Sequence, residues 1–190
     1  MALQPNLEGV RLLLQGGPAL QAQQVVVAAG AWSHQLAQTL GHKIPLEPER
    51  GYNTTLPPGA YELRRQLTFP GHGFVVTPIA GSVRVGGAVE LGGLQAPPNY
   101  RRADVLLAQA KKFLPALKTE GGSRWMGFRP SLPDSLPVIG AAPGQPRVFY
   151  AFGHGHLGLT QSAATAQIIA ALCAGQAPPL DLRAFDAARF

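Results

Sequence analysis

The chain has 190 residues, enough for one domain with a sizeable core or for two small domains. Its hydrophobic content of 46% and charged content of 14% indicate a globular protein and exclude a disordered one. The 16 basic residues exceed the 10 acidic ones, for a net charge of +6, but they are scattered and form no aromatic-interleaved stripe, which argues against nucleic-acid binding.

The first third of the chain predicts a hairpin followed by a buried strand. Val10–Leu14 and the residues around Leu20 and Ala22 flank a Gly-Gly-Pro turn. Residues 25–29 form an unbroken apolar run, which predicts a strand covered on both faces in a parallel sheet. Ser33 is the expected N-cap of a short helix that ends at Gly41.

The middle of the chain, from residue 50 to about 94, changes to strand-like alternation. Residues 74–77 and 82–85 predict a second hairpin, and Gly86-Gly87 predicts a bulge or a close approach of another backbone. Residues 104–114 predict an amphipathic helix. Its expected buried face is lined by Leu106, Ala110, Phe113 and Leu117.

A glycine-rich loop between a strand-like and a helix-like segment is the strongest functional signal. Gly153, Gly155 and Gly158 satisfy G-x-G-x-x-G. A dinucleotide-binding fingerprint needs a second strand after the helix, and the residues after Gly175 leave no room for one. The local chemistry is therefore a close backbone approach, with exposed N–H groups and a helix N-terminus facing an electron-rich group.

Three segments together carry a family resemblance: residues 25–33, residues 125–140 and residues 153–160. In this order and spacing they resemble the C-terminal half of the FAD-dependent D-amino-acid oxidase superfamily, most closely the bacterial D-amino-acid dehydrogenases. The resemblance implies an α/β fold. Residues 1–49 and 125–190 would be parts of a Rossmann-like FAD-binding domain, and residues 50–124 a sheet-rich α+β substrate-binding domain.

The resemblance implies oxidative deamination of a D-amino acid to a 2-oxo acid and ammonia, with hydride passing from Cα to flavin N5. The family's N-terminal dinucleotide-binding unit is absent, so we expect a truncated C-terminal portion whose partner is the missing half. Two alternatives are a glycine- or sarcosine-type amine oxidase of the same superfamily and a catalytically silent folded fragment. A basic module binding anionic lipid or nucleic acid is a third.

Arg129 is the first candidate for substrate binding. A planar, permanently charged guanidinium suits bidentate binding of a carboxylate, and Trp125 and Phe128 are expected to lower the dielectric around it. The ordinary alternative is a surface salt bridge. The resemblance implies that Arg129 binds the substrate carboxylate.

The cofactor contacts follow from the resemblance. They are expected at Gly30 and at the backbone of Gly155, His156, Leu157, Gly158, Leu159 and Thr160. Amides at the start of the helix would stabilise negative charge on the flavin as it accepts hydride. The resemblance also implies that the backbone carbonyl of His156 receives the substrate amine.

Two further features carry weaker expectations. Tyr52 lies at the entry to the expected substrate sheet, where its hydroxyl could support the carboxylate, although a tyrosine in a strand is more often part of the core. His154 and His156 lack a third ligand, so we expect packing roles and no metal site.

Localisation rests on composition and resemblance. No apolar run approaches the length of a membrane span and no secretory leader is evident, which predicts a cytoplasmic protein. Dehydrogenases of this family pass electrons to the respiratory chain. The basic chain would then contact the inner membrane peripherally.

Overall fold

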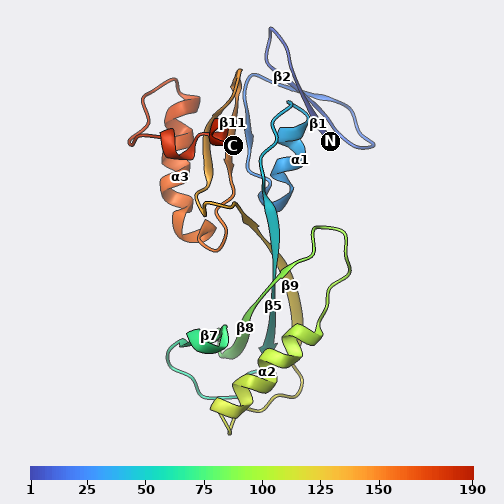
Figure 1. The fold of residues 1–190 in the computed structure, drawn as a ribbon, viewed down its shortest axis with the longest axis vertical. Coiled ribbons are helices and arrows are strands. Elements are labelled where there is room, and N and C mark those ends of the chain that lie inside the picture. The colour runs from blue at the N-terminus through green and yellow to red at the C-terminus, as the bar shows by residue number, and fades with distance from the viewer. The chain divides into compact units, whose positions relative to one another are not determined.

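The computed structural model describes residues 1–190 and divides the chain into two compact units (Figure 1). The first unit comprises residues 1–48 and 129–190, and the second comprises residues 49–128. The changeovers fall within two strands, β5 (Glu47–Leu56) and β9 (Ser123–Ser131). The expected boundaries were 49/50 and 124/125; the first changeover lies one residue earlier and the second four residues later.

The first unit begins with a small antiparallel sheet. Its strands are β1 (Ala2–Pro5), β2 (Val10–Leu13) and β3 (Leu20–Ala22). The pairing of β2 with β3 confirms the first expected hairpin, while β1 adds a strand that the sequence pattern did not predict. Leu3 and Val10 of this sheet are buried in the core of the unit.

A second sheet in this unit has the order β10–β11–β4. Its strands are β4 (Val25–Val27), β10 (Val138–Ala142) and β11 (Gln145–Phe152). β4 runs parallel to β11, as its unbroken apolar run predicts. The expectation that β4 is covered on both faces is wrong, because Val27 is buried while Val26, on the opposite face, is 40% exposed.

Two helices complete the first unit. They are α1 (Ser33–Gln38) and α3 (Gly158–Cys173). In Figure 1 they lie on opposite sides of this sheet. Ser33 is not the N-cap of α1, since that position is Trp32 and the Ser33 hydroxyl is buried without a hydrogen-bond partner.

The second unit is one sheet with the order β6–β7–β8–β5–β9, and its other strands are β6 (Leu67–Phe69), β7 (Phe74–Ile79) and β8 (Ser82–Leu91). The β7–β8 pairing confirms the second expected hairpin. Gly87 also fits its prediction, because a Cβ there would lie 2.4 Å from the Gly73 carbonyl oxygen and the β5–β8 register shifts beside it.

The helix α2 (Arg101–Phe113) packs on β8 and confirms the expected amphipathic helix. Leu106 and Ala110 are buried as expected. Phe113 lies on the same face, where its ring packs against Phe69 and Phe74, but it is 43% exposed; Leu117 is buried but follows the helix.

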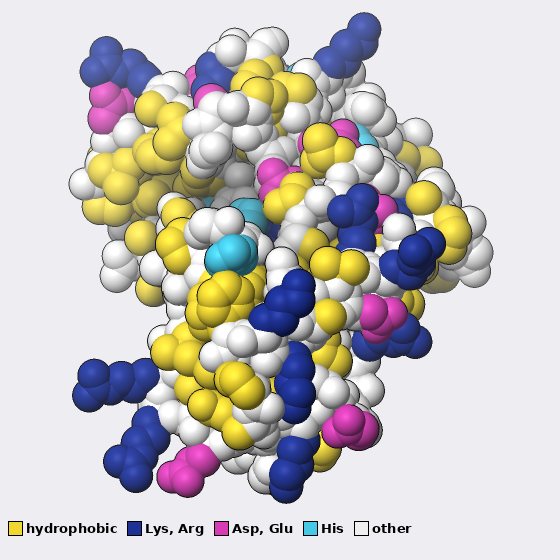
Figure 2. Space-filling view, turned by 60° about the horizontal axis from the view of Figure 1, so that its bottom comes forward, with side chains coloured by type: hydrophobic (Ala, Val, Ile, Leu, Met, Phe, Trp, Pro, Cys, Tyr) yellow, Lys and Arg dark blue, Asp and Glu magenta, His cyan; other side chains and the backbone are white.

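Short 3-10 helices complete the chain: η1 (Gly30–Trp32), η2 (Pro70–His72), η3 (Arg183–Phe185) and η4 (Ala187–Arg189). No helix is both long enough and apolar enough to span a membrane. On the face drawn in Figure 2, hydrophobic and uncharged surface separates the basic side chains, which form no continuous stripe.

Candidate active site

Two glycine turns leave the parallel pair of strands at the same edge of the sheet. Val27 of β4 is paired with Tyr150 of β11, and each of these two residues is followed three positions later by a glycine, Gly30 and Gly153. Both glycines have positive φ, 55° and 85°. Because the strands are parallel and in register, both turns lie at their carboxyl ends, which is where open α/β sheets bind ligands.

The loop from Gly153 to Gly158 packs against the end of β9 and the residue that follows it. A Cβ on Gly153 would lie 2.4 Å from Cδ1 of Leu132, so any other residue there would have to displace the Leu132 side chain. The Gly155 amide donates to the Pro130 carbonyl over 2.8 Å. The structure therefore joins two of the three motif segments, and this hydrogen bond falls one residue after Arg129.

The amide donors available to a ligand are those at the start of α3. The Leu157 amide donates to the His154 carbonyl, and the Gln161 amide donates to the Leu157 carbonyl. The amides of residues 158–160 open the helix and so have no acceptor within it. These donors carry the positive end of the helix dipole. The Gly155 amide, expected to face the flavin, is engaged with Pro130 instead.

The two histidines of the loop have different surroundings. His154 is half-buried, and its Nε2 lies 3.0 Å from Oγ1 of Thr165 on α3. Burial lowers the pKa of His154, which keeps the ring neutral at neutral pH. This fits the packing role expected from the sequence. His156 is exposed, and the role of its carbonyl remains a prediction.

Arg129 is half-buried on β9. Strand alternation puts Trp125 on the same face as Arg129 and Phe128 on the opposite face. Trp125 is 61% exposed, so it does not create a dry environment. The Phe128 ring instead lies under another guanidinium, that of Arg50, whose Cζ is 5.6 Å from the ring centroid. The expectation that Trp125 and Phe128 together lower the dielectric around Arg129 is therefore wrong.

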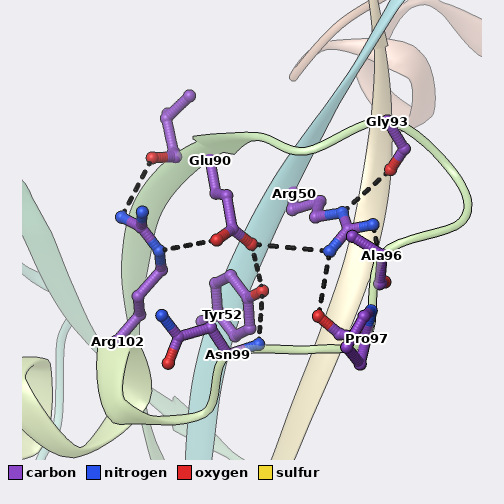
Figure 3. A network of polar contacts seen from close by, with 9 residues as sticks. Arg50, Tyr52, Glu90, Gly93, Ala96, Pro97, Asn99 and Arg102 are labelled. Atoms are coloured by element: carbon purple, nitrogen blue, oxygen red, sulfur yellow. Dashed lines mark hydrogen bonds and ion pairs between the residues drawn. The ribbon is translucent and has the colours of Figure 1, made fainter.

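The sequence analysis missed a buried polar cluster in the second unit (Figure 3). Arg50 on β5 is 1% exposed. It donates three hydrogen bonds, to the carbonyls of Gly93 (2.9 Å), Ala96 (2.7 Å) and Pro97 (3.2 Å), which tie down the loop after β8. Arg50 and Glu90 lie 40 positions apart in no recognised motif, so no sequence signal joins them.

Glu90 is the shared acceptor of this cluster. It pairs with Arg50 (3.6 Å) and Arg102 (3.2 Å), and Tyr52 donates its hydroxyl to the same carboxylate. The Tyr52 hydrogen bond, together with the two guanidinium groups, holds the pKa of Glu90 below its usual range. The carboxylate therefore stays ionised at neutral pH.

The Tyr52 hydroxyl also accepts a hydrogen bond from the Asn99 amide (3.0 Å). The side chain is 1% exposed, which matches the ordinary expectation of a core tyrosine. A contact between Tyr52 and a substrate carboxylate remains a prediction.

A buried polar atom without a hydrogen-bond partner lies close in sequence to each glycine turn of the first unit. Ser33 Oγ follows the Gly30 turn and Gln161 Oε1 lies in the first turn of α3; both are buried without a hydrogen-bond partner. Two other such atoms, on Asn53 and Thr54, lie on β5. Buried polar atoms are normally satisfied, so those at the two turns fit a site completed by a polar ligand.

Comparison with known proteins identifies the group to which this arrangement belongs. Residues 4–172 match the family model for DAO, the FAD dependent oxidoreductases. The chain belongs to this family. Its α/β fold and its resemblance to D-amino-acid oxidases and dehydrogenases are thereby confirmed, and the family's cofactor is FAD.

Two bacterial proteins are among the relatives of this DAO chain. It is 40% identical over 169 residues to the D-amino-acid oxidase of Bradyrhizobium diazoefficiens, covering 87% of this chain and 40% of that one. It is 34% identical over 174 residues to the D-amino acid dehydrogenase of Vibrio cholerae, covering 90% and 41%. The chain thus spans less than half the length of these relatives.

The fold has a solved counterpart. The glycine oxidase of Geobacillus kaustophilus superposes with a TM-score of 0.86 at 24% identity, and the match covers 100% of this chain and 51% of the oxidase. The iminodiacetate oxidase of Chelativorans sp. BNC1 gives a TM-score of 0.81 at 22% identity, covering 97% and 51%. At these identities the likeness concerns the fold alone.

Proposed function

We propose that this chain supplies the substrate-binding arginine and part of the flavin contacts for oxidation of a D-amino acid to its imino acid, which hydrolyses to a 2-oxo acid and ammonia. The observation that carries the proposal is the Gly155–Pro130 hydrogen bond, which joins the glycine loop to the segment of Arg129. The names of the bacterial relatives support the D-amino acid as substrate.

FAD, when bound, supplies the hydride acceptor. The residues of this chain would orient the substrate and stabilise charge on the cofactor. Arg129 would hold the substrate carboxylate through two parallel hydrogen bonds, and the His156 carbonyl would accept one from the amine. Amides of residues 158–160 would stabilise negative charge on the cofactor, and Gly30 would allow its close approach beside Ser33.

The first test is flavin binding followed by reduction. The purified chain is mixed with FAD and desalted, and its visible absorption spectrum is recorded before and after anaerobic addition of D-alanine, glycine or sarcosine. Retained flavin that D-alanine bleaches supports the proposal. Bleaching only by glycine or sarcosine would assign the chain to the other branch of the family, and retained flavin that none of them bleaches would overturn the proposed reaction.

A chain that retains no flavin would behave as a catalytically silent part. The specific observation in favour of that second candidate is length, since this chain covers only 40% of the Bradyrhizobium oxidase. In that case FAD binding needs further polypeptide, and the activity test moves to the complex that contains it.

Arg129→Lys then tests the substrate contact in whichever form retains flavin. The variant should keep the flavin spectrum and lose roughly 10- to 100-fold in kcat/KM, because a charged bidentate hydrogen bond is lost. Arg124→Lys is the matched control, since Arg124 is 49% exposed and pairs with Asp104 at the surface. Equal catalytic efficiency in the two variants would remove Arg129 from the site.

A further inference from the structure

The segment that joins β9 to β10, residues 132–137, encloses the first glycine of the glycine loop. Leu132 is 5% exposed, and its Cγ lies 3.1 Å from the position that a Cβ on Gly153 would take. Cα of Pro137, at the other end of the segment, lies 3.7 Å from the same position. A shift of this segment would therefore change the space around Gly153.

The segment folds as a tight turn with an uncommon backbone conformation. The Ser135 amide donates to the Leu132 carbonyl over 3.0 Å, and the φ of Ser135 is 61°. A residue other than glycine adopts this left-handed conformation only at a cost, so it persists where surrounding contacts hold it. One such contact comes from Asp134, whose Oδ1 accepts a hydrogen bond from the Leu136 amide over 3.1 Å.

The guanidinium of Arg189, which follows α3 in the chain, supplies further contacts to the turn. Its Nε donates to Oδ2 of Asp134 and its Nη2 to the Leu136 carbonyl, both over 2.7 Å. Its Nη1 donates to the Asp186 carbonyl over 2.9 Å. The side chains of Arg189 and Asp134 are 15% and 34% exposed, so water screens this ion pair only in part. The hydrogen bond from Arg189 holds the pKa of Asp134 below its usual range, which keeps the carboxylate ionised at neutral pH.

Arg183, six residues earlier, shows the ordinary behaviour of an arginine in this part of the chain. It pairs with Asp181, two positions away, and the two side chains are 91% and 58% exposed. An exposed pair between neighbours in sequence contributes little to stability. Arg189 differs because its partners on the turn lie 55 and 53 positions earlier.

We propose that Arg189 is a positioning residue for the glycine loop: by fixing the 132–137 turn it keeps Leu132 against Gly153, and the loop then aims the amides of residues 158–160 at the cofactor. The proposal rests on the proposed function in one respect, that those amides contact FAD. The Gly155 amide reports whether the loop is held, because it donates to the Pro130 carbonyl over 2.8 Å.

Hydrogen exchange of the Gly155 amide tests the proposal in this chain without flavin or substrate. In Arg189→Met this amide should exchange about tenfold faster, because the turn loses a charged hydrogen-bond donor. The Phe149 amide, on β11 at the centre of its sheet, should accelerate less. Arg183→Met is the matched control and should leave both amides unchanged. Arg189→Lys keeps the charge without the planar fork, so it should lie between; it replaces Arg189→Met if that variant does not fold.

A second measurement connects the loop to the cofactor. In whichever form of the protein retains flavin, Arg189→Met should raise the Kd for FAD roughly tenfold, since misaligned amides lose charged hydrogen bonds to the cofactor. Arg183→Met should leave that Kd unchanged. Circular dichroism at the temperature of the titration confirms that each variant is folded.

Three results would overturn the proposal: an unchanged Gly155 amide, equal acceleration at Gly155 and Phe149, or a faster Gly155 amide with an unchanged Kd for FAD. The second result would make Arg189 a purely structural residue, and the third would show that cofactor binding does not need it. Failure of amino acids to bleach the flavin of the unsubstituted protein, with both effects of Arg189→Met present, would remove only the proposed reaction. If no form of the protein retains flavin, the proposed function fails, and the Gly155 amide still decides whether Arg189 holds the loop.

Discussion

The two longest helices of the molecule illustrate two ways of treating apolar surface. α2 buries Ala103, Leu106 and Ala110 and carries charged residues at both ends. α3 is three residues longer, has no charge and buries only Ile168. The second unit therefore covers its main helix with its own sheet, whereas the first leaves its main helix open. The difference lies in composition as well as in cover, because α2 is a charged amphipathic helix and α3 carries no charged residue.

The two units also differ in how they tie down their loops. The second unit uses the buried guanidinium of Arg50, which bonds three carbonyls after β8. The first unit holds its glycine loop by backbone contacts such as Gly155–Pro130 and by glycines in close approach. Each unit contains one of the two tryptophans, Trp32 and Trp125, so Trp→Phe substitutions allow each unit's unfolding to be followed separately.

The substitution with the largest expected effect on stability is in the second unit. Arg50→Met should lower its free energy of unfolding by about 3–5 kcal/mol, because the carbonyls of Gly93, Ala96 and Pro97 lose a buried cationic donor. Urea unfolding followed by Trp125 fluorescence in a Trp32→Phe background measures it.

The control for Arg50 is Arg102→Met. Arg102 binds the same carboxylate but is 40% exposed, so its loss should cost less than about 1 kcal/mol. Equal losses in the two variants would show that the cluster acts as surface charge and does not anchor the loop.

The next effect concerns the glycine loop of the first unit. Gly153→Ala combines a φ of 85° with a Cβ 2.4 Å from Leu132. It should cost about 1–2 kcal/mol for the conformation and about 1–3 kcal/mol for the overlap. Gly144→Ala has a φ of 65° and open space, so only the first cost applies. Leu132→Ala should reduce the difference between them, as measured by Trp32 fluorescence in a Trp125→Phe background.

A smaller effect, of opposite sign, is expected at Ser33. Its hydroxyl is buried without a partner, so Ser33→Ala should stabilise the first unit by about 1 kcal/mol. If the hydroxyl contacts bound cofactor, the same variant should also bind FAD more weakly. Thermal unfolding with and without FAD separates the two effects. A destabilised Ser33→Ala in the absence of FAD would contradict this account of an uncompensated hydroxyl.

The smallest effect is a pH dependence carried by one carboxylate in each unit. The hydrogen bond from Arg189 holds the pKa of Asp134 below its usual range, and Tyr52 does the same for Glu90. A carboxyl pKa that is lower in the folded state stabilises the fold above the unfolded pKa of about 4, and this stability is lost as pH falls toward the folded value.

Asp134→Asn should therefore reduce the loss of thermal stability at low pH in the first unit alone, and Glu90→Gln should do so in the second unit alone. Thermal unfolding from about pH 7 to about pH 3, followed by the fluorescence of each tryptophan, measures this loss for each unit. If either substitution changes the pH dependence of both units, the units unfold together.

Much of the local structure was predictable because it depends on short-range chemistry. Residues 74–85 alternate around a tight turn, and residues 101–113 repeat at helical spacing, so both elements follow from the pattern. The glycine loop was predictable for the same reason, since Gly153 and Gly155 require the backbone freedom that their positive φ values show. The family followed from the order of three short segments.

The tertiary structure decided which surfaces are covered and which distant side chains meet. Val26 is apolar but exposed because coverage depends on what packs above a strand, which a strand's own sequence does not encode. Phe128 lies under Arg50 because strand alternation and the β5–β9 pairing set its neighbours. The sequence by itself determined periodicity, turns and family; the pairing of elements determined burial, because burial depends on contacts between residues far apart in the chain.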